Sequence, residues 1–167
     1  MVVAIYLSLT IVASAQRGPG DWHTITDASG RFSFSLPAEP QHQTQKDESH
    51  QEGPIITDIY LLKIDPNLYL AGLTQYPPAA SLPDEEELNL DRDNFDKQVK
   101  ATVVSEERKT YAGFPALEFK SKSEQMSFHC LIVKADHRVY QVVAAYKEAN
   151  EPSGSARFLN SLKLINP

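Results

Sequence analysis

The sequence predicts an α+β protein in which two main helices cover a mostly antiparallel β-sheet, an α/β/α sandwich. Short stretches of alternating or continuous apolar residues recur between turn residues, which is typical of strands joined by tight turns. Two other segments space their apolar residues as a helix does. The 167 residues contain no internal repeat, and this length suits one domain.

The composition places the chain among globular proteins. Hydrophobic residues make up 41% and charged residues 23% of the sequence, enough apolar side chains for a core, which excludes a disordered polymer. The 16 Lys and Arg residues are outnumbered by 22 Asp and Glu residues, giving a net charge of −6. This acidic balance argues against a nucleic-acid binder, because such proteins carry basic surfaces.

Residues 1–15 have the features of a signal peptide. The apolar run Val2–Val12 has no charged side chain and is shorter than the roughly 20 residues of a membrane-spanning helix. Ala13 and Ala15 bracket a cleavage triplet, so we expect an exported, periplasmic or secreted chain that begins at Gln16 and has no stable membrane span. The alternatives are a buried N-terminal strand or helix and a wrongly assigned start, because no Lys or Arg precedes the apolar run.

The mature chain is expected to consist of a short linker and one domain. Residues 16–21 are rich in Gly and Pro and predict a flexible linker, and residues 22–167 form the single α+β domain. The only cysteine is Cys130, so no internal disulfide can form. The strands predicted in the first half are 22–26, 31–36, an exposed edge strand running into a loop over 41–53, 55–64 and 68–76.

Apolar spacing predicts a helix near the middle of the chain. The residues of its apolar face, spaced by seven, four and four positions, are Leu88, Phe95, Val99 and Val103. Ser81 and Asp84 have the spacing of a capping box. The start of the helix is left open between Asp84 and Asp91.

The last third predicts four strands and a closing helix. The strands are 103–110, 114–120, 126–134 and 139–147, with a turn at Asp136 and His137. A two-residue turn places Cys130 opposite Val143 and leaves both faces of this hairpin apolar, so both should be covered. The closing helix opens at Pro152, with residues 153–155 as its cap, and its buried stripe is Phe158, Leu159 and Leu162.

Three short segments resemble proteins of the PsbP-like fold. They are Gly30–Pro37 (GRFSFSLP), Tyr111–Glu118 (YAGFPALE) and Arg157–Leu162 (RFLNSL), and the order of the predicted elements resembles that fold over nearly the whole domain. The group includes the extrinsic photosystem II protein and many small exported bacterial proteins, and a nuclear-import factor that binds the Ran GTPase shares the shape. The resemblance implies a fold, and it carries no catalytic, metal or partner residue over to this chain.

The sequence predicts no catalytic, cofactor-binding or metal-binding residues. His129 and Cys130 are adjacent on a predicted strand, so their side chains should point to opposite faces, and we expect a buried, inert thiol. The five histidines lack the ligand spacing of zinc motifs. Nucleophile-elbow, dinucleotide-binding and phosphate-loop motifs are absent from the sequence.

Residues 84–93 are the most acidic segment, with six carboxylates and one Arg. We interpret them as a solvated helix start whose charges complement the helix dipole. The alternative is a docking surface for a basic partner or a weak divalent-cation site. The candidate docking residues are Asp84, Glu85, Glu86, Glu87, Asp91 and Asp93.

Three functional hypotheses follow. The first is an exported, non-enzymatic binding or accessory module of the cell envelope with a protein partner. The second is a carrier that holds a small apolar ligand between the sheet and the helix 88–103. The third is a hydrolase-type enzyme using scattered His and Asp residues. An apolar cleft would favour the carrier, an exposed aromatic patch the module, and convergent titratable groups with shifted pKa values the enzyme.

Overall fold

The computed structural model describes residues 22–80, 82–147 and 151–165. The predicted signal peptide and linker therefore lie outside the described residues. The elements, in chain order, are β1 (His23–Thr26), β2 (Phe32–Leu36), β3 (Gln41–Asp47), β4 (Ile55–Ile64), β5 (Asn67–Gln75), the 3₁₀ helix η1 (Pro78–Ala80), α1 (Asp84–Val99), β6 (Thr102–Tyr111), β7 (Phe114–Lys122), β8 (Ser127–Ala135), β9 (Arg138–Tyr146), α2 (Ser153–Asn160) and β10 (Lys163–Leu164).

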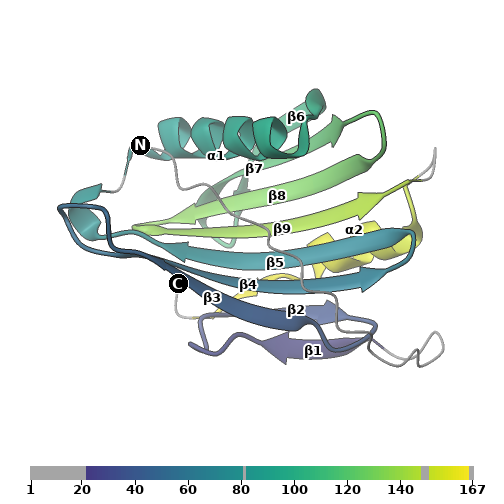
Figure 1. The fold of residues 1–167 in the computed structure, drawn as a ribbon, viewed down its shortest axis with the longest axis horizontal. Helices are drawn as coiled ribbons and strands as arrows, with labels where there is room; N and C mark the ends of the chain where they lie inside the picture. The colour runs from purple at the N-terminus through teal and green to yellow at the C-terminus, as the bar shows by residue number, and fades with distance from the viewer. Residues whose placement is uncertain (1–21, 81, 148–150, 166–167) are drawn as a thin grey trace.

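Two antiparallel sheets organise the described residues (Figure 1). The larger has seven strands in the order β3-β4-β5-β9-β8-β7-β6, and the smaller has three in the order β1-β2-β10. The helix α1 lies on one face of the large sheet, and α2 with the small sheet lies on the other. The predicted α+β class with a mostly antiparallel sheet is confirmed. The separate three-stranded sheet and β10 were not predicted.

Each face of the large sheet has its own hydrophobic core. The core between the large sheet and the layer of α2 and the small sheet includes Phe32, Phe34, Tyr60, Tyr140 and Phe158. The core between the large sheet and α1 includes Leu88, Leu117, Phe119, Cys130 and Ile132. The central strands β8 and β9 contribute to both cores and are apolar on both faces, as strands covered on two sides must be.

The hairpin formed by β8 and β9 has the predicted register. Cys130 pairs with Val143 and Ile132 with Gln141 across the two strands. Asp136 adopts a left-handed backbone conformation, with φ of 53°, in the turn between them. The alternation of the two strands and the short turn therefore place the thiol of Cys130 on the α1 side of the sheet.

The helix α1 begins at Asp84, which settles the open start, and ends at Val99, followed by Lys100 in the left-handed conformation. The assignment of Val103 to the helical face is wrong, because the chain has already entered β6 at that residue. Ser81 of the predicted capping box lies outside the described residues. The N-cap position is occupied by Pro83, which makes no side-chain capping bond.

The second helix, α2, also lacks a side-chain cap. Pro152 holds the N-cap position, so Ser153, Gly154 and Ser155 form the first turn of the helix and the predicted cap there is wrong. Gly154 permits a close approach to the sheet. A Cβ atom at this position would lie 2.8 Å from the hydroxyl of Tyr69 and 3.4 Å from the Trp22 ring.

Among the described residues, no helix is long and apolar enough to cross a membrane.

Candidate functional site

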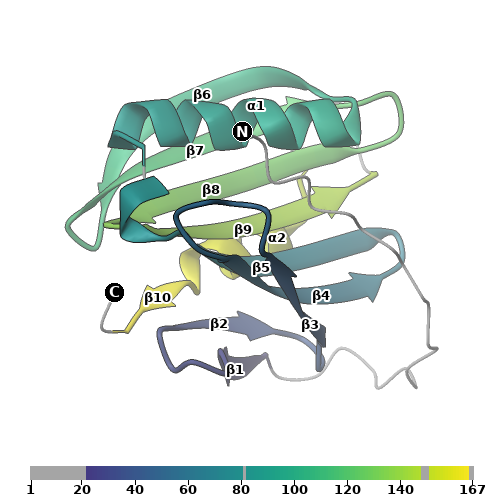
Figure 2. The ribbon, with the colours of Figure 1, turned by 60° about the vertical axis from the view of Figure 1, so that its left-hand side comes forward.

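The helix α1 covers only one side of its sheet face. It packs on β7 and β8, where the Phe95 ring meets those of Phe119 and Phe128 edge-on at 6.0 and 5.4 Å between centroids. The strands β4, β5 and β9 continue the same face beyond the helix. The loop between β3 and β4 lies on the same side of the sheet as α1 (Figure 2). A space is left between helix, loop and sheet.

This space is a cavity of about 450 Å³, within the range of small-molecule sites in proteins. Its floor consists of side chains from β4, β5 and β9, including the apolar Ile59, Leu70 and Val139, and its walls come from α1 and the loop. Gly72 leaves part of the floor without a side chain. A Cβ atom there would lie 3.3 Å from the Asp58 carbonyl oxygen, so this stretch of β5 is already tightly packed.

A buried ion pair lies at the α1 end of the cavity. Glu87 is 2% exposed and Lys134 is 1% exposed, and the Lys134 Nζ lies 3.5 Å from the Glu87 Oε2. The ammonium of Lys134 also donates to the Asp136 carbonyl oxygen at 2.6 Å. The backbone N–H of Leu82 donates to the Glu87 Oε2 at 3.1 Å. Glu87 is therefore a satisfied carboxylate, with both a charge partner and a hydrogen-bond donor.

Asp91, one helical turn after Glu87, is not satisfied. Its Oδ2 is buried and has no hydrogen-bond partner among the described residues. Burial raises the pKa of Asp91 to about 7, and the negative charge of Glu87 adds to the rise while Lys134 opposes it. A half-buried carboxyl group that titrates near neutrality thus lines the cavity.

Tyr76 places a phenol beside these carboxylates. Burial raises its pKa above the usual value, and the charges of Asp91 and Glu87 raise it further. The hydroxyl therefore stays protonated and can donate a hydrogen bond. Across the cavity from α1, the β3–β4 loop brings the polar residues His50, Gln51 and Glu52 to the cavity wall.

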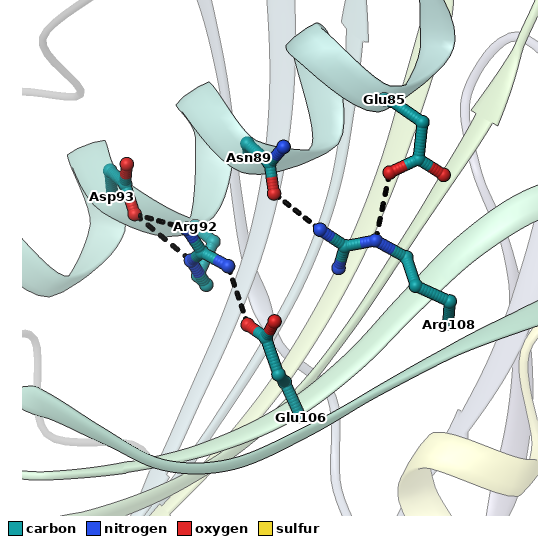
Figure 3. Close-up of polar contacts among 6 residues, drawn as sticks. All are labelled: Glu85, Asn89, Arg92, Asp93, Glu106 and Arg108. Atoms are coloured by element: carbon teal, nitrogen blue, oxygen red, sulfur yellow. Dashed lines mark hydrogen bonds and ion pairs between the residues drawn. The ribbon is translucent and has the colours of Figure 1, made fainter.

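Two of the predicted docking residues, Glu85 and Asp93, form ion pairs with arginine side chains. Figure 3 shows these pairs together with the neighbouring contacts that connect α1 to the edge strand β6. The Glu85 Oε2 accepts from the Arg108 Nε at 2.9 Å, and Arg92 bridges Asp93 and Glu106 at 2.8 and 2.5 Å. Surface pairs of this kind contribute little stability each, but here they fix the helix against the sheet edge.

The remaining acidic residues differ in exposure. Asp84 and Glu86 are exposed at the start of α1, as a docking surface requires. Glu87 is buried, so its assignment to the surface is wrong, and Asp91 faces the cavity. Helical geometry is the reason, because residues 87 and 91 lie one turn apart on the side of α1 that also carries Leu88 and Phe95.

A separate cluster of charged side chains surrounds His129, on the face of the large sheet that is turned away from α1. Its Nε2 is 2.6 Å from the Glu118 Oε1 and its Nδ1 is 2.5 Å from the Glu151 Oε1. Lys109 pairs with Glu118, and Lys120 donates to the Glu151 Oε2 at 2.7 Å. All five groups are paired, which indicates a structural link between β7, β8 and the segment before α2.

The neighbouring Cys130 points away from His129, as predicted. It is fully buried toward α1, and burial raises the pKa of its thiol well above the usual value. The two residues therefore cannot act as a nucleophile and base. No group of three or more His, Cys, Asp or Glu side chains within the described ranges is arranged to hold a metal ion.

A solved structure with the same arrangement of elements is the solution structure of the cyanobacterial PsbP protein CyanoP from Synechocystis sp. It matches with a TM-score of 0.60 at 10% identity and covers 93% of this chain and 99% of that one. The chain has a PsbP-like fold. At this identity the likeness concerns the fold alone.

Other comparisons add little to the PsbP-like match. A crystal structure from Bacteroides thetaiotaomicron matches with a TM-score of 0.41 at 9% identity, over 89% of this chain and 49% of that one, and carries no argument here. No protein-family model matches the chain, and no curated protein matches it.

Within this PsbP-like fold, sequence reasoning missed the group formed by Tyr76, Glu87, Asp91 and Lys134. The signal for this group in the local sequence was the spacing of Glu87 and Asp91, two acidic residues one helical turn apart beside the apolar face of the helix. The other members come from β8 and from the residue after β5, so only the folded chain brings them together. The expected position of a ligand, between sheet and helix, agrees with the cavity.

Proposed function

We propose that the protein is an exported, non-enzymatic binding protein that holds a small, largely apolar molecule in the cavity between α1 and the large sheet. The single observation that carries this proposal is the cavity of about 450 Å³ with apolar side chains on its floor. Contact with such a floor removes apolar ligand surface from water, which is the main source of affinity for small molecules.

Two further observations support a functional cavity in an exported protein. Beside the cavity, the buried Oδ2 of Asp91 has no hydrogen-bond partner among the described residues, whereas the nearby Glu87 is already paired. An unpaired buried carboxylate costs folding free energy, and such costs are concentrated at functional sites. The signal-peptide features of residues 1–15 support export.

Cavity filling tests the proposal. The matched pair of variants is Leu70→Trp and Leu68→Trp, because both leucines lie on the same face of β5 and are partly buried, but only Leu70 lines the cavity. The probes are three phenylbutyl compounds of equal length, 4-phenylbutylamine, 4-phenylbutan-1-ol and 4-phenylbutanoate, titrated into the folded chain by calorimetry.

We expect saturable binding of at least one probe to the wild type. The Leu70→Trp variant should lose at least about tenfold in affinity, while Leu68→Trp should bind as the wild type does. Absence of saturable binding for all three probes, or equal binding by the two variants, would overturn the proposed function.

Asp91 also favours a second candidate function. A carboxyl group with a pKa near 7 inside a cavity has the property of a general base, so a proton-transfer enzyme is the alternative. Turnover of a carbon acid by the wild type, lost in Asp91→Asn while probe binding is retained, would favour this alternative over the carrier.

A further inference from the structure

We propose that the molecule held in the cavity is an organic cation, with an apolar body on the sheet and a primary ammonium group bound to the carboxylate of Asp91. This inference rests on the proposed function and adds the charge of the ligand to it. It would make the protein a receptor for amphiphilic amines rather than for neutral or anionic apolar compounds.

The hydrogen-bond inventory of the site points to a donor on the ligand. The Oδ2 of Asp91 is buried without a partner among the described residues, and a buried acceptor without a donor costs roughly 1–3 kcal/mol. Glu87 already accepts from Leu82 and faces Lys134. An ammonium group in the cavity would supply the missing donor and the missing charge together.

The charges around the cavity point to a positive ligand. The ionisable groups that line it are His50 and Glu52 from the loop, Tyr76 after β5, and Glu87 and Asp91 from α1. Lys134 of β8 pairs with Glu87 but does not itself line the cavity. The described lining includes no Lys or Arg. Lys134 offsets Glu87, so Asp91 and Glu52 leave the site negative. An anionic ligand would meet carboxylates without an opposite charge.

The floor of the cavity is suited to the rest of the ligand. Ile59, Leu70 and Val139 supply the apolar part of the floor, and Phe95 adds an aromatic ring from α1. The polar residues of the same strands that line the cavity are Thr57, Thr74 and Gln141. Asn94 and Gln98 lie further along the same helix and also line the cavity. An amine with an aliphatic or aromatic body can therefore bury its body on the sheet while its ammonium reaches Asp91.

The three phenylbutyl probes test the charge preference directly, because they share body and length but differ in charge. At pH 8 we expect 4-phenylbutylamine to bind at least about tenfold more tightly than 4-phenylbutan-1-ol, as one charge-assisted hydrogen bond in a buried site provides. We expect 4-phenylbutanoate to bind more weakly than the alcohol.

Asp91→Asn isolates the residue, since the amide keeps the size of the side chain and removes its charge. The matched control is Asp84→Asn, on an exposed position at the start of the same helix. We expect the amine preference to disappear in Asp91→Asn and to remain in Asp84→Asn. The alcohol should still bind saturably to both variants, which also shows that the cavity is intact.

Acidification gives a second readout that needs no variant. Lowering the pH from 8 to 5.5 protonates Asp91, whose pKa is about 7, while the amine stays charged. The affinity for the amine should fall by about tenfold or more, and that for the alcohol should change much less. His50 also lines the cavity, and the loss of this pH dependence in Asp91→Asn assigns it to Asp91.

The outcomes distinguish this inference from the proposed function. Equal affinity for amine and alcohol, or a preference that survives in Asp91→Asn, would overturn the cation proposal and leave the carrier function standing. Tighter binding of 4-phenylbutanoate would also overturn it. Failure of every probe to bind would overturn both.

Discussion

Phe158 joins three elements through one side chain. Its ring is fully buried and meets the rings of Tyr69 and Phe34 edge-on, at centroid distances of 5.3 and 6.2 Å. It therefore connects α2 to β5 of the large sheet and to β2 of the small one. Offset and edge-on aromatic contacts of this kind add to the free energy gained from burial itself.

We expect Phe158→Ala to lower the free energy of unfolding by about 3–5 kcal/mol, because it removes a buried ring and leaves a cavity between three elements. Chemical denaturation of the purified chain measures the change. A loss below about 1 kcal/mol would show that α2 is not docked on the core.

Whereas Phe158 stabilises the folded chain, the ionised carboxyl group of Asp91 destabilises it. Because the folded chain raises the pKa of this carboxyl group, folding is favoured by its protonation, and the full cost of burying its charge is present above pH 7. We expect Asp91→Asn to raise the unfolding free energy by about 2–4 kcal/mol at pH 8. At pH 4 the two proteins should be nearly equal in stability.

Thermal unfolding at the two pH values measures this difference, which corresponds to several degrees in Tm for a chain of this size. A variant that is less stable than the wild type at pH 8 would show that Asp91 has a favourable partner in the folded chain.

At the scale of elements, the cluster of Glu118, His129 and Glu151 ties the segment before α2 to the sheet. Burial alone would raise the pKa of both carboxyl groups. Hydrogen bonds from Lys109 and His129 to Glu118, and from Lys120 and His129 to Glu151, outweigh burial, so both pKa values lie below the usual 4.5. Carboxyl groups with lowered pKa values stabilise the fold above pH 4.5, and this contribution is lost as the pH falls through their folded-state values.

We expect Glu151→Gln to lower the unfolding free energy at pH 6 by about 1–3 kcal/mol, because two charge-assisted hydrogen bonds are lost. The difference from the wild type should shrink below pH 4, where the wild-type carboxyl group is also protonated. The control is Glu124→Gln, at an exposed position in the turn before β8. A difference that does not depend on pH would contradict the ion-pair interpretation.

An element could be predicted well where residues close together in the sequence determine it, and poorly where distant residues do. The β8–β9 hairpin was predicted to the residue pair, because period-two alternation and a two-residue turn determine its register. The strand β10 has only two residues and exists because it pairs with β2, which no local pattern indicates. The apolar spacing extended α1 to Val103, whereas the left-handed Lys100 ends it four residues earlier.

At the scale of the whole molecule, the fold class and its likeness to PsbP were predictable, and the candidate site was only partly so. The expected position of a ligand followed from an amphipathic helix above a sheet. The chemistry of the site did not, because its ionisable side chains come from α1, from the end of β5 and from β8. Glu87, expected on the surface, is buried and forms an internal ion pair with Lys134.

Export remains a prediction at this scale. We expect the mature chain to begin at Gln16, because the Ala13-Ser14-Ala15 triplet follows an apolar run of signal-peptide length. Intact mass of the protein recovered from the exported fraction of its host measures the N-terminus. A chain that retains Met1 would contradict the prediction.

The two edges of the large sheet, β3 and β6, bear on how the protein behaves at high concentration. Both edge strands are mainly exposed and polar, and unpaired strand edges invite pairing with other chains. Val104 on β6 is 68% exposed, but it sits where the pairing with β7 skips a residue, between Val103 and Ser105. A neighbouring molecule that approaches this apolar position therefore meets an interrupted ladder followed by the charged residues 106–109, which disfavours growth of a sheet from one molecule to the next.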